Sequence, residues 1–356
     1  MLLTCALLFP MLMPAALPQS RIARLDGGYT TGKLTAAGLE SVTLEVGQGA
    51  SRDFPSNQII SLKPGPLPEL VSKGEVFLKD LDFQNATNSF DAASSEDGDF
   101  WLAPYASLRH AEALLAWAQQ DPARASDAAR AFRSWSDANP DSYWLPRAQM
   151  GAAKAMAMAG DVDGATSLMQ KLSDTAFERN LGRHVELQVN LVRCEAFLLG
   201  GQAEVAEARL RDLVVKLDSA VTDPKAADGA KALYLAMSSR AKIRLGDAIT
   251  QKDGARTASS YWQGLASDRN ATADVRAAAW IGIASAARES GNLRQAQLQL
   301  AKVIATLPAS DEVMAHALYD LGEVSKALDN NPIPGETYHQ RLREQYPNTS
   351  WAAKVR

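Results

Sequence analysis

The sequence predicts a mainly α protein, an α-solenoid of helix hairpins preceded by a small antiparallel β-barrel domain. Three observations support this expectation. Residues 21–63 carry short alternating runs rich in β-branched residues and Gly, which is typical of strands. From residue 69 onward, apolar residues recur at the i, i+3, i+4 and i+7 spacing of amphipathic helices. A spaced set of small and large apolar residues also repeats along this helical part, as stacked hairpins require.

Residues 1–20 form an apolar segment without a charged side chain. The run is interrupted by Pro10 and Pro14 and is shorter than a membrane span, so it resembles the apolar core of a signal peptide. We therefore expect an exported protein of the periplasm or cell envelope, with a buried N-terminal segment or a retained anchor as alternatives. Cys5 lies in this segment, and its removal would leave Cys194 as a single thiol without an intrachain partner.

Residues 21–63 are expected to fold as four or five short strands that curl into a small barrel. The alternating runs are residues 29–35, 41–46, 52–54 and 58–62. This pattern resembles the SH3-like and Sm-like small barrels that precede helical repeats in some exported bacterial proteins. Residues 64–68 contain three prolines and predict a stiff linker, because proline cannot continue a strand ladder.

Residues 69–356 are expected to form five to seven antiparallel helix hairpins. Short breaks that contain Gly punctuate the helical pattern, and at each of them one helix should end and its partner begin. The breaks lie at Gly160-Asp161, Gly200-Gly201, Gly246-Asp247 and Gly291-Asn292. Because each hairpin leaves an apolar face open, consecutive hairpins must stack, which produces a curved superhelix with a concave groove.

The repeated pattern resembles the tetratricopeptide consensus, in which a small residue of the second helix lets the first helix approach closely. Large apolar residues four and seven positions later stack on the same face and fill the space between hairpins. We assign repeat-packing roles to Leu70, Gly74, Phe77, Ala86, Phe90, Ala128, Phe132, Trp135, Ala165, Met169, Ala206, Leu210, Trp280, Ala284, Ala296 and Leu300. Cys194 takes a small-residue position in the first helix of its repeat, which predicts a packed thiol.

The last repeat carries a second resemblance. The stretch Tyr346-Pro347-Asn348-Thr349-Ser350-Trp351-Ala352 is similar to a junction of envelope tetratricopeptide proteins, which include outer-membrane assembly lipoproteins and periplasmic cell-division coordinators. A looser internal copy is Asn139-Pro140-Asp141-Ser142-Tyr143-Trp144. The resemblance implies an envelope location and a protein-binding mode, and it names no particular partner.

Charge and motifs argue against nucleic-acid binding and against catalysis. The chain has 37 Lys and Arg against 41 Asp and Glu, a formal charge of -4, without a clustered basic stripe. The stretch from Gly27 to Lys33 matches part of a phosphate-binding loop, but Leu34 stands where that loop needs Ser or Thr, so we interpret its glycines as turn residues. The histidines lie apart, without metal-ligand spacing, and are His110, His184, His316 and His339. We therefore expect no enzymatic activity, metal or cofactor.

The expected function is that of a non-enzymatic scaffold or adaptor, which binds a protein partner in the concave face of the solenoid. Most of the seven tryptophans are expected in the core between hairpins, whereas Trp101, Tyr143 and Trp144 are candidates for a groove-lining role. Two alternatives stay open. One is a self-associating module that forms a homo-oligomer, and the other is a ligand-binding protein or enzyme with its site between barrel and solenoid.

Overall fold

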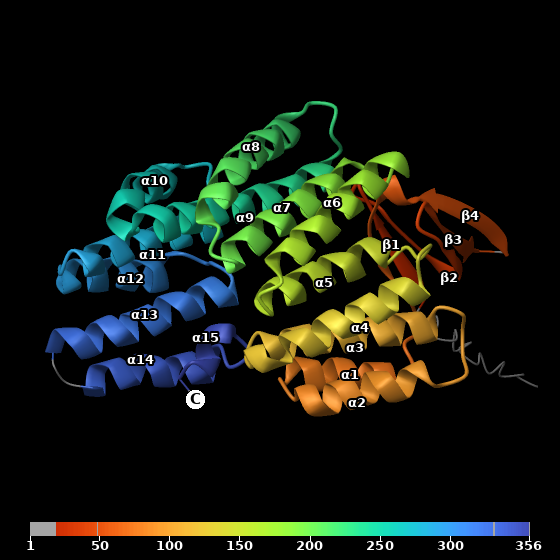
Figure 1. The fold of residues 1–356 in the computed structure, drawn as a ribbon, viewed down its shortest axis with the longest axis horizontal. Coiled ribbons are helices and arrows are strands. Elements are labelled where there is room, and N and C mark those ends of the chain that lie inside the picture. The colour runs from red at the N-terminus through yellow and green to blue at the C-terminus, as the bar shows by residue number, and fades with distance from the viewer. Residues whose placement is uncertain (1–18, 48, 330–331, 356) are drawn as a thin grey trace, which may run out of the picture.

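The computed structural model describes residues 19–47, 49–329 and 332–355. The expected signal segment therefore lies almost wholly outside the described residues. Within those residues a five-stranded sheet is followed by fifteen α-helices, and consecutive helices pack as antiparallel pairs that follow an arc (Figure 1). The predicted fold class, a tetratricopeptide-like α-solenoid of helix hairpins after a small antiparallel sheet, is confirmed.

The N-terminal sheet is antiparallel, with the strand order β4-β3-β2-β1-β5. The strands are β1 (Ser20–Arg24), β2 (Tyr29–Ala37), β3 (Ser41–Val46), β4 (Ala50–Pro55) and β5 (Ile59–Lys63). Alternate side chains such as Ile22 and Leu44 are fully buried, as the two-residue period of a strand requires. The first half of the long strand β2 pairs with β1 and its second half pairs with β3, so this strand joins the two halves of the sheet. The register of the β2–β3 pairing shifts between Leu34 and Ala36, as at a β-bulge.

Seven helix hairpins and a short final helix make up the solenoid in the described residues. The hairpins are α1 (Glu69–Lys79) with α2 (Phe83–Ser94), α3 (Leu102–Ala118) with α4 (Ala125–Ala138), α5 (Leu145–Met158) with α6 (Val162–Glu178), α7 (Arg183–Leu199) with α8 (Ala203–Thr222), α9 (Asp228–Asp253) with α10 (Ala255–Ser267), α11 (Ala273–Glu289) with α12 (Leu293–Thr306), and α13 (Asp311–Asp329) with α14 (Pro332–Gln345). The final helix is α15 (Ser350–Ala353). In the part of the chain that is described, no helix is long and apolar enough to span a membrane.

Three of the predicted helix breaks coincide with turns between the two helices of a hairpin, and Gly160-Asp161 shows how such a turn is built. Gly160 has a φ of 89°, which favours Gly because a Cβ is strained there. The Asp161 carboxylate then accepts a hydrogen bond from the backbone N–H of Gly164 at 2.9 Å, which caps the N-terminus of α6. The chain thus reverses within three residues.

The predicted break at Gly246-Asp247 is wrong, because both residues lie inside α9. The turn into α10 comes at Gly254 instead, whose φ is 83°. Gly246 has a packing role: a Cβ at this position would lie 2.0 Å from Cη2 of Trp262 on α10. The absence of a side chain is what lets the two helices approach, and the same arrangement recurs where Gly74 faces Phe90.

The sheet is docked on the side of the solenoid near the start of α5. The backbone N–H of Leu39 donates to the carbonyl of Asp141 at 2.7 Å, and the N–H of Tyr143 donates to the carbonyl of Ala37 at 3.0 Å. On another side of the sheet, the N–H of Ala230 in α9 donates to the carbonyl of Leu25 at 2.8 Å. These backbone hydrogen bonds join segments far apart in sequence and place the sheet beside the helix ends at one edge of the hairpin stack, at the right of Figure 1.

Candidate functional site

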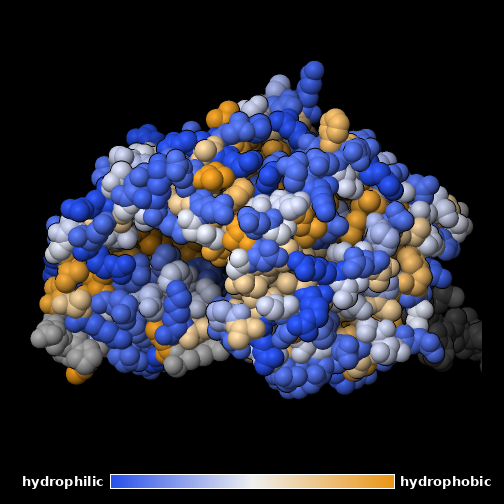
Figure 2. Space-filling view, in the orientation of Figure 1, coloured by the Kyte–Doolittle hydropathy of each residue, from blue (hydrophilic) through white to orange (hydrophobic). Residues whose placement is uncertain are grey.

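The inner face of the arc contains a cavity of about 840 Å³. Most of its wall comes from the first helices of the hairpins, with Lys154 on α5, Glu195 on α7 and Arg240 on α9. The two ends of the solenoid also contribute, because Leu78 at the end of α1 and Ser350 of α15 line the same cavity. Figure 2 shows the surface hollowed between the hairpins of the N-terminal half and α13. The solenoid therefore curls far enough for its first and last hairpins to face one space.

A carboxylate–guanidinium pair lies in the wall of this cavity. The Glu195 carboxylate is only 8% exposed and accepts two hydrogen bonds from Arg240, at 2.5 Å from Nε and 2.6 Å from Nη2. Arg244 adds a longer contact, with its Nε 3.5 Å from Glu195 Oε1, and donates from Nη1 to Asp247 at 2.8 Å. The bidentate hydrogen bonds hold the Arg240 guanidinium and the Glu195 carboxylate in a fixed orientation to one another.

Lys154 lies beside this pair but forms no hydrogen bond or ion pair with it. Among the described residues its ammonium has no hydrogen bond and no ion pair. Burial lowers the pKa of Lys154, and the nearby Arg240 lowers it further, while the field of Glu195 acts in the opposite direction. Lys154, Arg240 and Arg244 carry three positive charges, and Glu195, Asp247 and Glu312 carry three negative ones, so the cavity wall has no net charge. The ammonium of Lys154 is nevertheless without an ion pair among the described residues, and this local positive group favours an acidic ligand group.

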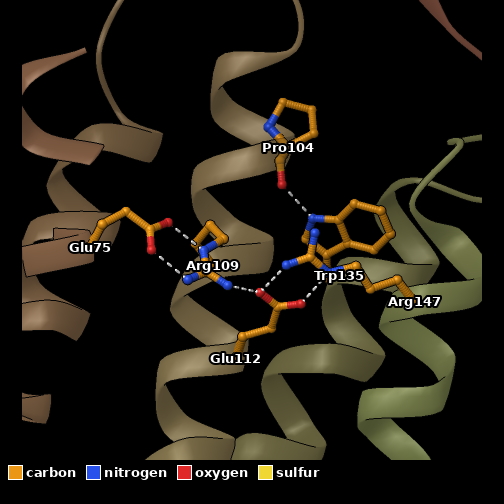
Figure 3. A network of polar contacts seen from close by, with 6 residues as sticks. All are labelled: Glu75, Pro104, Arg109, Glu112, Trp135 and Arg147. Atoms are coloured by element: carbon orange, nitrogen blue, oxygen red, sulfur yellow. Dashed lines mark hydrogen bonds and ion pairs between the residues drawn. The ribbon is translucent and has the colours of Figure 1, made fainter. Parts of the chain in front are cut away.

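A second charged network stiffens the same row of helices nearer the N-terminus (Figure 3). Arg109 on α3 donates to both oxygens of Glu75 on α1, at 2.6 and 2.7 Å, and also to Glu112. Glu112 in turn accepts from Arg147 on α5, at 2.6 Å from Nη2. Each of these charges is already paired, so the network joins three helices and offers no free group to a ligand.

A cavity of about 470 Å³ lies farther along the inner face and shares Asp247 with the first one. It is lined by α9, α11 and α13 and by Trp351. The ring of His316 stacks on that of Trp351, with centroids 3.8 Å apart, and His316 Nε2 lies 3.5 Å from Asp320. The inner face thus continues as a hollow with both aromatic and charged walls.

The assigned repeat-packing residues lie between helices. Thirteen are buried, namely Gly74, Ala86, Phe90, Ala128, Phe132, Trp135, Ala165, Met169, Ala206, Leu210, Ala284, Ala296 and Leu300. Leu70, Phe77 and Trp280 are partly buried, and the Lys302 ammonium lies 3.5 Å from the centre of the Trp280 ring. Cys194 is packed in the core as expected, and burial raises the pKa of its thiol to about 12.

The three candidate groove aromatics are not in the concave face, and for Trp101 and Trp144 the groove-lining role is wrong. Their side chains are 2% and 3% exposed, which leaves too little surface for a partner in a groove. Trp101 packs edge-on against Tyr105, which in turn contacts Trp144. Tyr143 is also removed from the groove, because the docked sheet covers the start of α5, where Tyr143 and Trp144 lie.

Sequence reasoning missed Lys154, Glu195 and Arg240. They stand about forty residues apart, on three different hairpins, and no local motif connects them. The signal that could have found them is a polar residue in an otherwise apolar or Ala-rich stretch of a first helix, as Lys154 is within Gly151 to Ala157. Among the described residues there is no group of three metal-ligating side chains, and the four histidines do not come together.

Comparison with known proteins assigns this chain to no family. No family model matches the chain, and no curated protein matches it. Among solved structures the chain is similar to the crystal structure of NprR in complex with its cognate peptide NprX. The two are 11% identical, the match covers 80% of each chain, and the TM-score is 0.44. A likeness at that level carries no inference about what this chain binds.

Proposed function

We propose that this protein is a non-enzymatic scaffold or adaptor of the bacterial cell envelope, and that it binds a segment of a protein partner in the concave face of its solenoid. The observation that carries the proposal is the cavity of about 840 Å³ with the unpaired Lys154 ammonium in its wall. Cavities of this size lie within the usual range of about 300–1,000 Å³ for ligand sites.

The mixed character of the wall favours a peptide segment as the occupant. Apolar side chains such as Phe83, Leu115 and Leu199 line the same cavity as the charged group of Lys154. A segment with one acidic and one apolar side chain would satisfy both parts of this wall at once. The bidentate pair of Glu195 with Arg240 then serves to hold the arginine in place beside the incoming acidic group.

The charged groups of the cavity support binding rather than catalysis. Of the three carboxylates in the wall, Glu195 is bonded to Arg240, Asp247 to Arg244, and Glu312 accepts a hydrogen bond from the Ser350 hydroxyl, so each already has a donor. Lys154 has a lowered pKa, but among the described residues it has no hydrogen-bonded partner that could relay a proton. The envelope location is supported by two features of the sequence, the apolar segment at residues 1–20 and the junction at residues 346–352.

Site-specific photo-crosslinking in the native host tests this proposal. A photo-reactive residue is placed at Leu199, which is 56% exposed in the cavity, and as a matched control at Val215 of α8, which is 69% exposed and does not line the cavity. We expect a discrete envelope protein crosslinked from position 199 and not from position 215. Equal crosslinking from both positions, or none from 199, contradicts the proposal. A second copy of this chain crosslinked from 199 would favour self-association instead.

A further inference from the structure

A separate cavity of about 190 Å³ lies between the N-terminal sheet and the solenoid. Apolar side chains form most of its wall, with Ile59 and Leu62 on the side of the sheet and Met150 and Leu181 on the side of the helices. The rings of Tyr143 and Trp144 also line it, so two of the aromatic residues noted in the sequence meet here rather than in the concave groove. This space shares no lining residue with the 840 Å³ cavity.

Unpartnered polar atoms gather around this cavity. Seven buried side-chain nitrogen or oxygen atoms of the described residues have no hydrogen-bond partner, and three belong to residues that line this one space. They are Nε1 of Trp144, Nδ1 of His184 and Oγ of Ser56, in side chains 3%, 5% and 6% exposed. Buried polar atoms are nearly always paired, since an unpaired one loses its hydrogen bonds to water without replacement.

Other indole groups of this chain do find partners. Nε1 of Trp135 donates to the carbonyl of Pro104 at 2.6 Å, and Nε1 of Trp262 donates to Oγ1 of Thr250 at 3.2 Å. Among the tryptophans of the described residues, Trp144 alone has an indole nitrogen that is fully buried and without a partner. An indole N–H is a donor only, so what it lacks is an acceptor.

Among the described residues that line this cavity, none carries an unpaired charge. Arg147 at its edge is already bonded to Glu112, and burial lowers the pKa of His184, so its imidazole is neutral at pH 7. One side of the His184 imidazole is already hydrogen-bonded to the backbone of Ile59, so the unpartnered Nδ1 of this neutral ring supplies an acceptor. The Ser56 hydroxyl supplies a donor and an acceptor, and Trp144 supplies a donor. A charged ligand would lose its hydration in such a site without a counter-charge.

We propose that this cavity is a binding site for a small neutral molecule with an apolar body and an amide group, whose oxygen accepts the indole N–H of Trp144. The amide also offers N–H donors, which match the acceptors on His184 and Ser56. The volume is below the usual range of about 300–1,000 Å³, so the ligand is smaller than a typical drug. This site is independent of the proposed function, and either proposal can fail without the other.

Three molecules of one shape test both the location and the neutrality of the ligand: benzamide, benzamidinium and benzoate. The full-length protein is labelled with ¹⁵N at tryptophan, and the seven indole N–H signals are followed by NMR during each titration. We expect benzamide to move the Trp144 signal saturably, while the hydrogen-bonded indoles of Trp135 and Trp262 serve as internal controls and stay in place. Benzamidinium and benzoate should bind at least about tenfold more weakly, because each brings a charge into an apolar site.

Two conservative variants complete the test. Trp144→Phe replaces the indole by a smaller aromatic ring and removes the N–H donor, and Ser56→Ala removes the hydroxyl at the other polar position. With ¹⁹F NMR of 4-fluorobenzamide as the readout, each should weaken binding by about fivefold, the value of one neutral hydrogen bond. Unchanged binding in both variants would overturn the proposal. So would a Trp144 signal that benzamide does not move, equal shifts of all indoles, or tighter binding of either charged molecule. A long-lived water contact at Trp144 that benzamide does not displace would show hydration only.

Discussion

Gly246 of α9 and Trp262 of α10 are packed without room for a single methyl group between them. A Cβ on Gly246 would lie 2.0 Å from Cη2 and 2.1 Å from Cζ2 of the indole. The indole is held in place, because Gly282 of α11 lies against its five-membered ring and Nε1 is bonded to Thr250. Three helices of two hairpins are thus held together around one ring.

Replacing Gly246 by Ala should destabilise the protein by about 1–3 kcal/mol, the usual cost of overpacking a core. Gly264 is the matched control, since it lies inside α10 and a Cβ added there would have no atom within 4 Å. Gly264→Ala should leave stability unchanged or raise it by up to about 1 kcal/mol, because Ala is the better helix former. Urea unfolding followed by circular dichroism measures both. Equal midpoints for the two variants would contradict the packing role of Gly246.

Replacing Lys154 by Met should weaken partner binding about tenfold and should not reduce stability. The partly buried ammonium lacks a direct partner among the described residues, so its removal breaks no ion pair and relieves a partly desolvated charge. Lys171→Met on α6 is the control, because this side chain is exposed and does not line the cavity. Crosslinking yield from position 199 and the thermal midpoint are the two measurements. A stability loss in Lys154→Met with unchanged crosslinking would show that Lys154 has only a structural role.

Stability should fall as the pH drops below about 6.5, and His184 should account for part of the fall. Burial lowers the pKa of His184 from its ordinary value of 6.5, against a weaker opposite effect from the backbone carbonyl of Ile59. The unfolded chain therefore takes up a proton at a higher pH than the folded chain, and stability is lost as the pH falls from the unfolded toward the folded pKa. Urea midpoints between pH 7.5 and 5.5 should vary less in His184→Gln than in the parent. An unchanged slope would contradict this role.

The Cys194 thiol should be unreactive in the folded protein. Burial raises its pKa to about 12, so the thiolate that attacks a disulfide reagent is scarce at pH 8. A Cys5→Ser variant leaves Cys194 as the single cysteine, and its reaction with a chromogenic disulfide should be slow in buffer and rapid in urea. Stoichiometric labelling within seconds in buffer would show that the thiol is accessible, contrary to its place in the core.

Much of the hairpin architecture could be predicted from the sequence because its determinants are local. The distance from Ala86 to Phe90 is one helical turn, and both lie on the buried face of α2. The turn at Gly160-Asp161 combines a positive φ with a capping carboxylate, and both effects act within a few residues. The prediction for Gly246 was wrong because the sequence alone does not distinguish a Gly that ends a helix from a Gly inside a helix that packs against an indole.

The candidate sites could not be predicted, because they depend on how hairpins rotate relative to one another and on where the sheet docks. Lys154, Glu195 and Arg240 meet only when α5, α7 and α9 are placed side by side. Likewise, Trp144 is removed from the groove by hydrogen bonds between the sheet and the turn before α5, such as that from Leu39 to Asp141. Neither relationship is carried by the spacing of residues along the chain.

The meeting of Leu78 and Ser350 in one cavity wall has a thermodynamic consequence for the whole array. In a stack of repeats each unit contacts only its neighbours, so the terminal units open most readily. An occupant that touches both ends at once would tie the opening of the first hairpin to that of the last. Amide exchange in α1 and in α14 should then slow together when the partner binds, although more than two hundred residues separate them in the chain. The occupant would turn a linear array into a closed cooperative unit.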